Sequence, residues 1–198
     1  MIATRKLAGA AALALAAGCA AARPAWAPVA GGTWSPPSGR YALQLPDGWM
    51  LRGEADHVLA SRDGIFLQRI DVGRREVGKP LGGTKKMLAR GMLPQEVAEV
   101  VQDAIMSSPG MQGTTMLENG PAEVDGRPGF KLVFGFKDAD GLKLRAVLYG
   151  VLVEDSLYEL AFRAPERHYF GRDLAAFEQV RATFTVRAPV AVRASGAE

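Results

Sequence analysis

The chain has 198 residues, with 24 lysine and arginine residues against 21 aspartate and glutamate residues, and a single cysteine. This length suits one domain with one core, and one cysteine excludes a disulfide within the chain. Without Arg5 and Lys6, which lie in a leader described next, 22 basic residues face 21 acidic ones. A balance this close to neutral argues against a nucleic-acid-binding protein.

The first residues have the parts of a secretory signal peptide. Arg5 and Lys6 are the only early charges, and the uncharged residues 7–22 follow them. A basic start, a short apolar stretch and small residues at its end are typical of such a leader. The apolar stretch is shorter than the roughly 20 residues that cross a bilayer, so we do not expect a permanent transmembrane helix.

The sequence Leu15-Ala16-Ala17-Gly18-Cys19 resembles the lipobox of bacterial lipoproteins, with Ala16 where leucine is most usual. The resemblance implies that residues 1–18 are removed and that Cys19 carries a diacylglyceryl group. No aspartate follows Cys19, which by the same resemblance implies the periplasmic face of the outer membrane in a Gram-negative cell. A secreted protein that is cut near residue 22 or 27, and so loses Cys19, is the alternative.

The rest of the chain divides by composition. Residues 19–37 are rich in alanine, proline and glycine without a period, which predicts a tether. Residues 188–198 have no pattern that would bury them, which predicts a flexible tail. Residues 38–187 are therefore expected to form a single domain.

The domain begins with residues that favour strands. Residues 41–45 alternate between polar and apolar and end at the turn sequence Pro-Asp-Gly. Residues 57–61 and 65–72 are separated by Arg-Asp-Gly, which predicts a hairpin. Residues 73–83 are expected to form a loop.

Two helices are expected in mid-chain. Residues 85–92 are a short candidate with Thr84 as its N-cap. A longer helix is expected from Pro94 until residues 107–110 (Ser-Ser-Pro-Gly). Five of its residues lie on one apolar face of the helix: Val97, Val100, Val101, Ala104 and Ile105.

The last third of the chain predicts three strands and a helix. Residues 129–137, 142–154 and 157–164 are joined by short turns, which predicts an antiparallel meander. Spaced apolar residues from Phe170 to about Ala182 predict a C-terminal helix. Strands next to strands, with helices set apart, indicate an α+β fold: an antiparallel sheet of about six strands flanked by helices.

Two segments carry a family resemblance. "LPDGWM" (residues 45–50) follows the first strand, and "YELAFRAPERHYFGRDLAAFEQVRATF" (residues 158–184) joins the last strand to the last helix. Together with the meander they are similar to the PsbP/Mog1-like fold. The resemblance implies an αβα sandwich and a mostly non-enzymatic role as an accessory, assembly or binding protein.

The residues that carry chemistry form no recognisable constellation. His57 and His168 have no neighbouring ligand at metal-binding spacing and are interpreted as ordinary surface residues. The chain has no Gly-x-Ser-x-Gly, and residues 78–86 have Thr84 before Lys85, the wrong order for a phosphate loop. Residues 138–141 are interpreted as a hairpin turn and not as a calcium loop. We therefore expect no catalytic residue, metal or cofactor.

Two clusters remain open. The basic cluster is interpreted as a solvated loop, with an anionic headgroup or acidic partner as the alternative; it consists of Arg74, Arg75, Lys79, Lys85 and Lys86. The five methionines favour packing between helix and sheet or an adaptable apolar pocket, with Cu(I) as the alternative; they are Met87, Met92, Met106, Met111 and Met116.

The sequence therefore predicts a lipid-anchored envelope protein without enzymatic activity, which serves as an accessory or protein-binding module. Its partners would be the membrane, through the lipid on Cys19, and an envelope protein. The alternative is a carrier that holds an apolar small molecule or lipid between sheet and helix near the methionines. An enzyme is less favoured, and would need a pocket with two carboxylates or a His–carboxylate pair.

Overall fold

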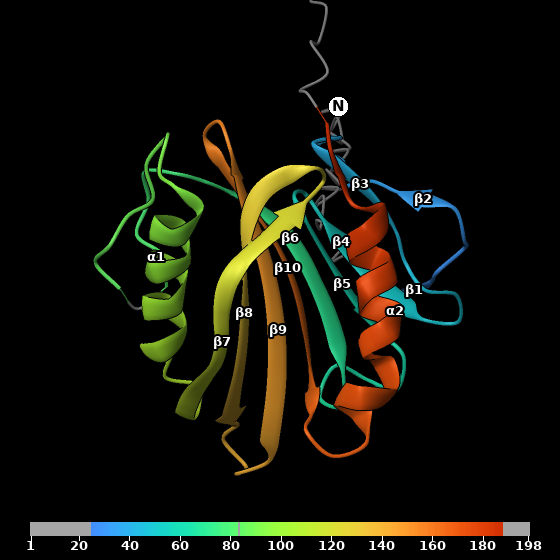
Figure 1. The fold of residues 1–198 in the computed structure, drawn as a ribbon. Helices are drawn as coiled ribbons and strands as arrows, with labels where there is room; N and C mark the ends of the chain where they lie inside the picture. The colour runs from blue at the N-terminus through green and yellow to red at the C-terminus, as the bar shows by residue number, and fades with distance from the viewer. Residues whose placement is uncertain (1–24, 83, 188–198) are drawn as a thin grey trace, which may run out of the picture.

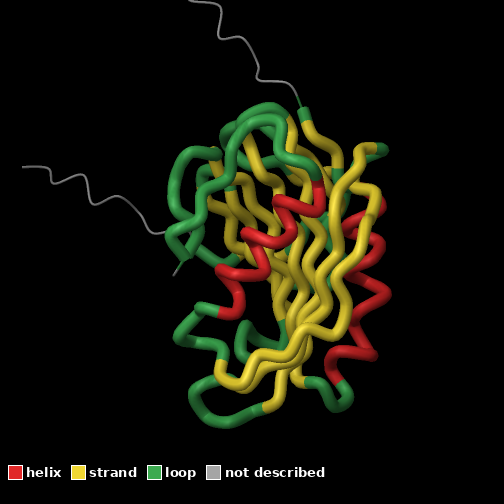
Figure 2. Tube along the Cα trace, turned by 60° about the vertical axis from the view of Figure 1, so that its left-hand side comes forward, coloured by secondary structure: helices red, strands yellow, loops and turns green. Residues whose placement is uncertain are grey.

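The computed structural model describes residues 25–82 and 84–187 (Figure 1). Cys19, the predicted leader 1–18 and the predicted tail 188–198 lie outside the described residues. The described chain forms a large antiparallel sheet with one helix on each side, as two views show (Figures 1 and 2). This confirms an α+β fold, with eight strands in the main sheet where the sequence suggested about six.

The main sheet has the strand order β1-β4-β5-β6-β10-β9-β8-β7, and every neighbouring pair is antiparallel. Its strands are β1 (Ala27–Pro28), β4 (Met50–Glu54), β5 (His57–Ser61), β6 (Arg69–Glu76), β7 (Gln112–Val124), β8 (Arg127–Lys137), β9 (Lys143–Val153) and β10 (Ser156–Pro165). A second sheet has the order β11-β3-β2, formed by β2 (Thr33–Trp34), β3 (Tyr41–Gln44) and β11 (Thr185–Val186).

Helix α1 (Pro94–Met106) confirms the helix expected from Pro94. The Glu96 carboxylate accepts a hydrogen bond from the Leu93 backbone N–H at 2.7 Å, which satisfies one of the free donors at the helix start. The expected apolar face, including Val97 and Val101, is buried against Phe130 and other residues of the sheet. Its main contacts are with β7, β8 and β9.

Helix α2 (Tyr169–Thr183) confirms the expected C-terminal helix and covers the other face of the sheet. Its Phe177 is fully buried and stacks on Phe162 of β10, with ring centroids 5.7 Å apart. Tyr41 and Phe184 extend the same core towards the second sheet. Each face of the main sheet therefore has its own hydrophobic core.

The meander β8-β9-β10 is confirmed by continuous antiparallel registers. Residues 138–141 form the turn between β8 and β9, as expected. The Asp138 carboxylate accepts hydrogen bonds from the backbone N–H groups of Asp140 and Leu142, at 3.0 and 2.9 Å. This is the usual way in which aspartate stabilises a tight turn.

Several elements differ from the sequence expectations. The predicted helix over residues 85–92 is wrong, since this segment is irregular and meets Pro80 through a bridge at Met87. The second strand of the first hairpin begins at Arg69 and not at residue 65, because Leu67 and Gln68 donate to the Gly64 carbonyl in a tight turn. That strand continues to Glu76, into the predicted loop.

Part of the predicted tether pairs with the domain. Strand β1 pairs with β4, and β2 pairs with β3. Trp34 is partly buried and lies over Gly53, where an added Cβ would come within 2.8 Å of the indole ring. The ordered domain therefore includes residues ahead of position 38.

Candidate functional site

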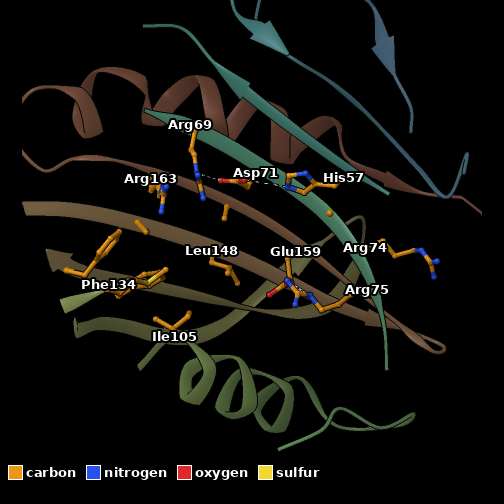
Figure 3. Close-up of a pocket in the computed structure, with 15 residues that line it drawn as sticks. His57, Arg69, Asp71, Arg74, Arg75, Ile105, Phe134, Leu148, Glu159 and Arg163 are labelled. Carbon is orange, nitrogen blue, oxygen red and sulfur yellow. Dashed lines mark ion pairs between the residues drawn. The ribbon is translucent and has the colours of Figure 1, made fainter. Parts of the chain in front are cut away.

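An open groove lies on the α1 side of the main sheet. Helix α1 packs mainly on β7, β8 and β9, and the strands β5, β6 and β10 continue the sheet beyond it. The groove has a volume of about 480 Å³ and 15 lining residues (Figure 3). It is the space between the helix and the part of the sheet that the helix does not reach.

The strand alternation explains why this space is charged. In β6, Ile70 and Val72 are buried on the α2 side, so Arg69 and Asp71 face the groove. In β10, Leu160 and Phe162 are buried on the α2 side in the same way. This leaves three residues of β10 half-buried on the groove side: Glu159, Ala161 and Arg163.

The register places groove residues in rows across the strands. Arg69 of β6 pairs with Arg163 of β10, Arg163 pairs with Ala146 of β9, and Ala146 pairs with Phe134 of β8. One row therefore runs from two arginines, over a small residue, to an aromatic ring. Neighbouring strands are about 4.8 Å apart, so this row spans about 14 Å.

Small side chains form the floor of the groove. Asp71 pairs with Ala161, and the groove residue Gly73 pairs with Glu159. Because Gly73, Ala146 and Ala161 carry little or no side chain, the sheet leaves a hollow between larger neighbours. Apolar side chains form the walls of this hollow: Ile105, Met111, Phe134, Phe136 and Leu148.

Two carboxylates in the groove are held by arginines. Asp71 lies 2.7 Å from Arg69 Nε and 3.4 Å from His57 Nε2, and Glu159 lies 2.7 Å from Arg75 Nε (Figure 3). Burial raises the pKa of Glu159, although the charge and hydrogen bond of Arg75 oppose that shift.

Arg163 differs from these groups because it makes no ion pair with any residue that the structure describes. It stands directly opposite Arg69, and like charges in that position repel each other. Burial, and then the charge of Arg69, lower the pKa of Arg163, while Asp71 and Asp138 oppose the shift. The guanidinium nevertheless stays charged at neutral pH. The groove thus holds an unpaired cation beside an apolar wall.

The groove contains a His–carboxylate contact and two carboxylates, which are the features that an enzyme would need. Both carboxylates are already engaged by arginine, and His57 is 41% exposed with a long contact to Asp71. None of the described residues that line the groove has a hydroxyl, thiol or primary amine that could act as a nucleophile. The arrangement suits binding better than covalent chemistry.

The structure separates the residues that the sequence singled out. His57 lies in the groove, whereas His168 precedes α2 on the opposite side of the sheet and contacts Tyr169 edge to face. Met111 lines the groove, Met92 and Met116 pack against the α1-side core, and the other two methionines are exposed.

The basic cluster is largely paired. Arg74 contacts Asp56 and Glu76, at 3.1 and 3.3 Å, and Arg75 contacts Glu159. Lys86 pairs with the Asp103 carboxylate of α1. Three of its five members are therefore neutralised locally and do not form a free basic surface.

The sequence did not identify Arg69, Asp71, Glu159 and Arg163 as a group. The signal was present, because charges alternate with apolar residues in both "RIDVGRRE" and "LYELAFRA". Alternation tells which residues share a face, but it does not tell which part of that face a helix covers.

Within residues 25–82 and 84–187, no group of three or more histidine, cysteine or acidic side chains is placed to hold a metal ion. Across the same residues, no helix has the length and apolar character needed to cross a membrane.

No protein-family model and no curated protein matches the sequence. Solved structures do resemble the fold. Cyanobacterial PsbP (CyanoP) from Synechocystis sp. PCC 6803 is 15% identical, with 86% of this chain and 96% of that chain covered and a TM-score of 0.52. The Ran-binding protein Mog1p of Saccharomyces cerevisiae is 9% identical, with 80% and 96% covered and a TM-score of 0.52.

The protein has a PsbP/Mog1-like fold. LpqN of Mycobacterium tuberculosis, described as involved in cell envelope biogenesis, shares it at 13% identity, with 83% of this chain and 91% of that chain covered and a TM-score of 0.50. Identities this low establish the PsbP/Mog1-like fold and not a shared activity. The fold expected from residues 45–50 and 158–184 is therefore confirmed.

Proposed function

We propose that this protein is a lipid-anchored, non-enzymatic binding module of the cell envelope, which holds a small apolar molecule in the groove beside α1. The groove carries the proposal. Its volume of about 480 Å³ lies within the range of roughly 300–1,000 Å³ that is common for small-molecule sites. Its apolar walls also match such sites, and its six charged side chains, four of them arginines, supply polar groups that can orient a ligand.

The envelope location is supported by the lipobox-like sequence that ends at Cys19. LpqN, which has the same fold, is described as involved in cell envelope biogenesis. Seven residues separate Cys19 from β1, which begins at Ala27, and an extended chain of that length reaches at most about 25 Å. A lipid on Cys19 would hold the domain close to the membrane surface.

A role without catalysis is supported by the composition of the groove. Its carboxylates are paired with arginines, and its described lining has no hydroxyl, thiol or primary amine. Mog1p, which has the same fold, is described as a binding protein.

The second candidate is an accessory module that binds an envelope protein. The observation that favours it is an exposed apolar patch formed by Trp26, Met50 and Phe66, which line a second hollow of about 430 Å³. Phe66 is 85% exposed. Large apolar side chains exposed together are common at protein contacts.

The decisive experiment is mass spectrometry of molecules that copurify with the protein from its own envelope. Ala161→Phe fills the floor of the groove, and Gln179→Phe adds the same ring to the exposed side of α2 as a matched control. We expect an apolar molecule with the wild type and with Gln179→Phe, and at least tenfold less of it with Ala161→Phe. Equal amounts in all three proteins would overturn the groove as the binding site.

The same preparations test the second candidate. Photo-crosslinking from position 66 and from position 161 separates the two surfaces. The accessory role would be favoured over the carrier role by two results together: an envelope protein crosslinked at position 66, and no decrease in copurified small molecule in Ala161→Phe.

A further inference from the structure

We propose that the molecule held in the groove carries an anionic group, a carboxylate or a phosphate, and that Arg163 binds it together with Arg69. The remainder of the ligand would lie along the apolar wall formed by Phe134, Leu148 and Ile105. This inference rests on the proposed function, since it names the class of ligand for the same groove.

The first support is the balance of charge at one end of the groove. Arg69 and Arg163 are cross-strand neighbours, and Asp71 contacts Arg69 at 2.7 Å. Two cations therefore share one adjacent carboxylate. Asp138, the other acidic residue that influences Arg163, is engaged in its own turn through the backbone N–H groups of Asp140 and Leu142.

The second support is the cost of leaving Arg163 without an anion. Its side chain is half-buried and faces the like charge of Arg69 across the strand pair. Desolvated cations in proteins are normally paired. A bound anion would supply the missing partner, and guanidinium groups bind carboxylate and phosphate oxygens with two parallel hydrogen bonds.

The third support is the position of the apolar surface. Figure 3 shows Phe134 at the same end of the groove as Arg163 and Arg69, with Ile105 of α1 on the facing wall and Leu148 between the two ends. Phe134 and Phe136 lie with ring centroids 5.9 Å apart, which gives a broad aromatic surface. A molecule with an anion at the arginine pair can lay its apolar part directly on this surface.

The opposite end of the groove is less suited to an anion. Glu159 lies four residues before Arg163 in β10, or about 13 Å along the strand. Arg75 is already paired with Glu159. The ligand is therefore expected to bind in one orientation, with its anionic group at Arg163.

The backbone of the floor favours a small molecule over a peptide strand. Strand β6 is paired on both edges, by β5 and β10, and β10 is paired by β6 and β9. A peptide cannot extend the sheet at this place, because the ladder hydrogen bonds are already made. Recognition must come from side chains.

The test is displacement of a fluorescent fatty acid, 11-(dansylamino)undecanoic acid, from the full chain carrying Cys19→Ala, which cannot be acylated. The competitors, used below their micelle concentrations, are laurate, dodecyl phosphate, dodecan-1-ol and inorganic phosphate. We expect laurate and dodecyl phosphate to displace the probe at least tenfold better than dodecan-1-ol, and inorganic phosphate not to displace it. Either preference between laurate and dodecyl phosphate supports an anionic ligand and tells which headgroup it has.

The variants assign the anion to its residue. Arg163→Gln should lower the affinity for laurate at least tenfold and leave the affinity for dodecan-1-ol unchanged. Arg75→Gln removes the same charge from the other end of the groove and should change laurate affinity less than about threefold. If Arg163→Gln does not fold, Arg163→Lys keeps the positive charge but replaces the planar guanidinium by an ammonium group. This variant should lower the affinity for laurate by about threefold.

The outcomes distinguish failure of the anionic ligand from failure of the small-molecule function. Equal displacement by laurate and dodecan-1-ol, or equal effects of Arg163→Gln and Arg75→Gln, would overturn the anionic ligand and leave an apolar groove standing. No binding of any apolar compound would overturn the small-molecule function itself.

Discussion

At the level of single residues, a polar cluster outside the groove joins the start of β6 to α2. Gln68 and Asp173 are almost fully buried, and the Gln68 amide donates to Asp63 at 2.9 Å and to Asp173 at 3.3 Å. The Arg172 guanidinium contacts both carboxylates. Buried polar groups cost free energy unless they are paired, so this cluster fixes how the helix end meets the strand.

Asp63→Asn tests this cluster through pH. Hydrogen bonds from Arg172, and then from Gln68, hold the pKa of Asp63 below its ordinary value of 3.8. The ionised Asp63 therefore stabilises the folded protein above about pH 4, and this contribution is lost as the pH falls through the lower pKa of the folded state. We expect Asp63→Asn to lower the melting temperature at pH 7, and the difference from the wild type to shrink at pH 3.

Thermal unfolding followed by circular dichroism gives this comparison. Asp140→Asn, on the exposed β8–β9 turn, is the matched control and should change the melting temperature little at either pH. A difference between Asp63→Asn and the wild type that stays constant from pH 7 to pH 3 would contradict the role assigned to the Asp63 carboxylate.

At the level of elements, the sequence predicted those whose pattern is strong and local. Helices α1 and α2 and the strands β8, β9 and β10 each have a clear apolar period, and all five are present. Strand β7 was missed because it is an edge strand with shifts in its register and a mixed sequence, QGTTMLENGPAEV. Strand β4 was missed because its sequence, MLRGE, lacks the alternation of polar and apolar residues, and none of its residues is fully buried.

The candidate site could not be predicted in the same way, because it depends on tertiary packing. Arg69 and Arg163 are 94 positions apart and meet only when β6 pairs with β10. The hollow above them exists because α1 packs over β7–β9 and not over β6. No local pattern in either strand contains that information.

Gly150→Ala tests how tightly the α1-side core is packed against β9. An added Cβ at Gly150 would come within 2.2 Å of the Phe130 ring, which is buried under α1. The ring would have to move, so we expect a loss of about 1–3 kcal/mol in the free energy of unfolding. Urea denaturation measures this value.

Gly135→Ala in β8 is the control for that measurement, because its added Cβ would meet only the Leu144 carbonyl oxygen, at 3.8 Å. It should change the free energy of unfolding by less than about 0.5 kcal/mol. Equal losses in both variants would indicate that these strands tolerate no added Cβ in general, and would contradict a specific clash between position 150 and Phe130.

At the level of the whole molecule, the proposed function combines a membrane anchor on Cys19 with an open binding groove. The described domain begins close to Cys19 in sequence, and its first two strands pair with β4 of the main sheet and β3 of the second sheet. A lipid on Cys19, if attached as proposed, would keep the domain within a short distance of the bilayer, with the groove open to solvent. Such an arrangement would suit exchange of a small amphiphilic molecule with the membrane surface.

Cys19→Ala tests the anchor. We expect the wild type and Ala20→Ser to remain in the washed membrane fraction and Cys19→Ala to leave it, with no change in melting temperature because position 19 precedes the paired strands. Intact mass spectrometry should place the mature amino terminus at a diacylated Cys19. An unmodified amino terminus near residue 23 or 28 would instead support the secreted protein.

The position of the ligand on the fold is tested most directly by nuclear magnetic resonance of the uniformly ¹⁵N-labelled Cys19→Ala chain during titration with laurate. We expect the backbone amides of Asp71, Ala146 and Ala161 to shift in proportion to occupancy, together with those at the end of α1 near Ile105. The amides along the exposed side of α2 should stay unchanged. Shifts that gather on α2 or around Phe66, with none in the groove, would contradict the account.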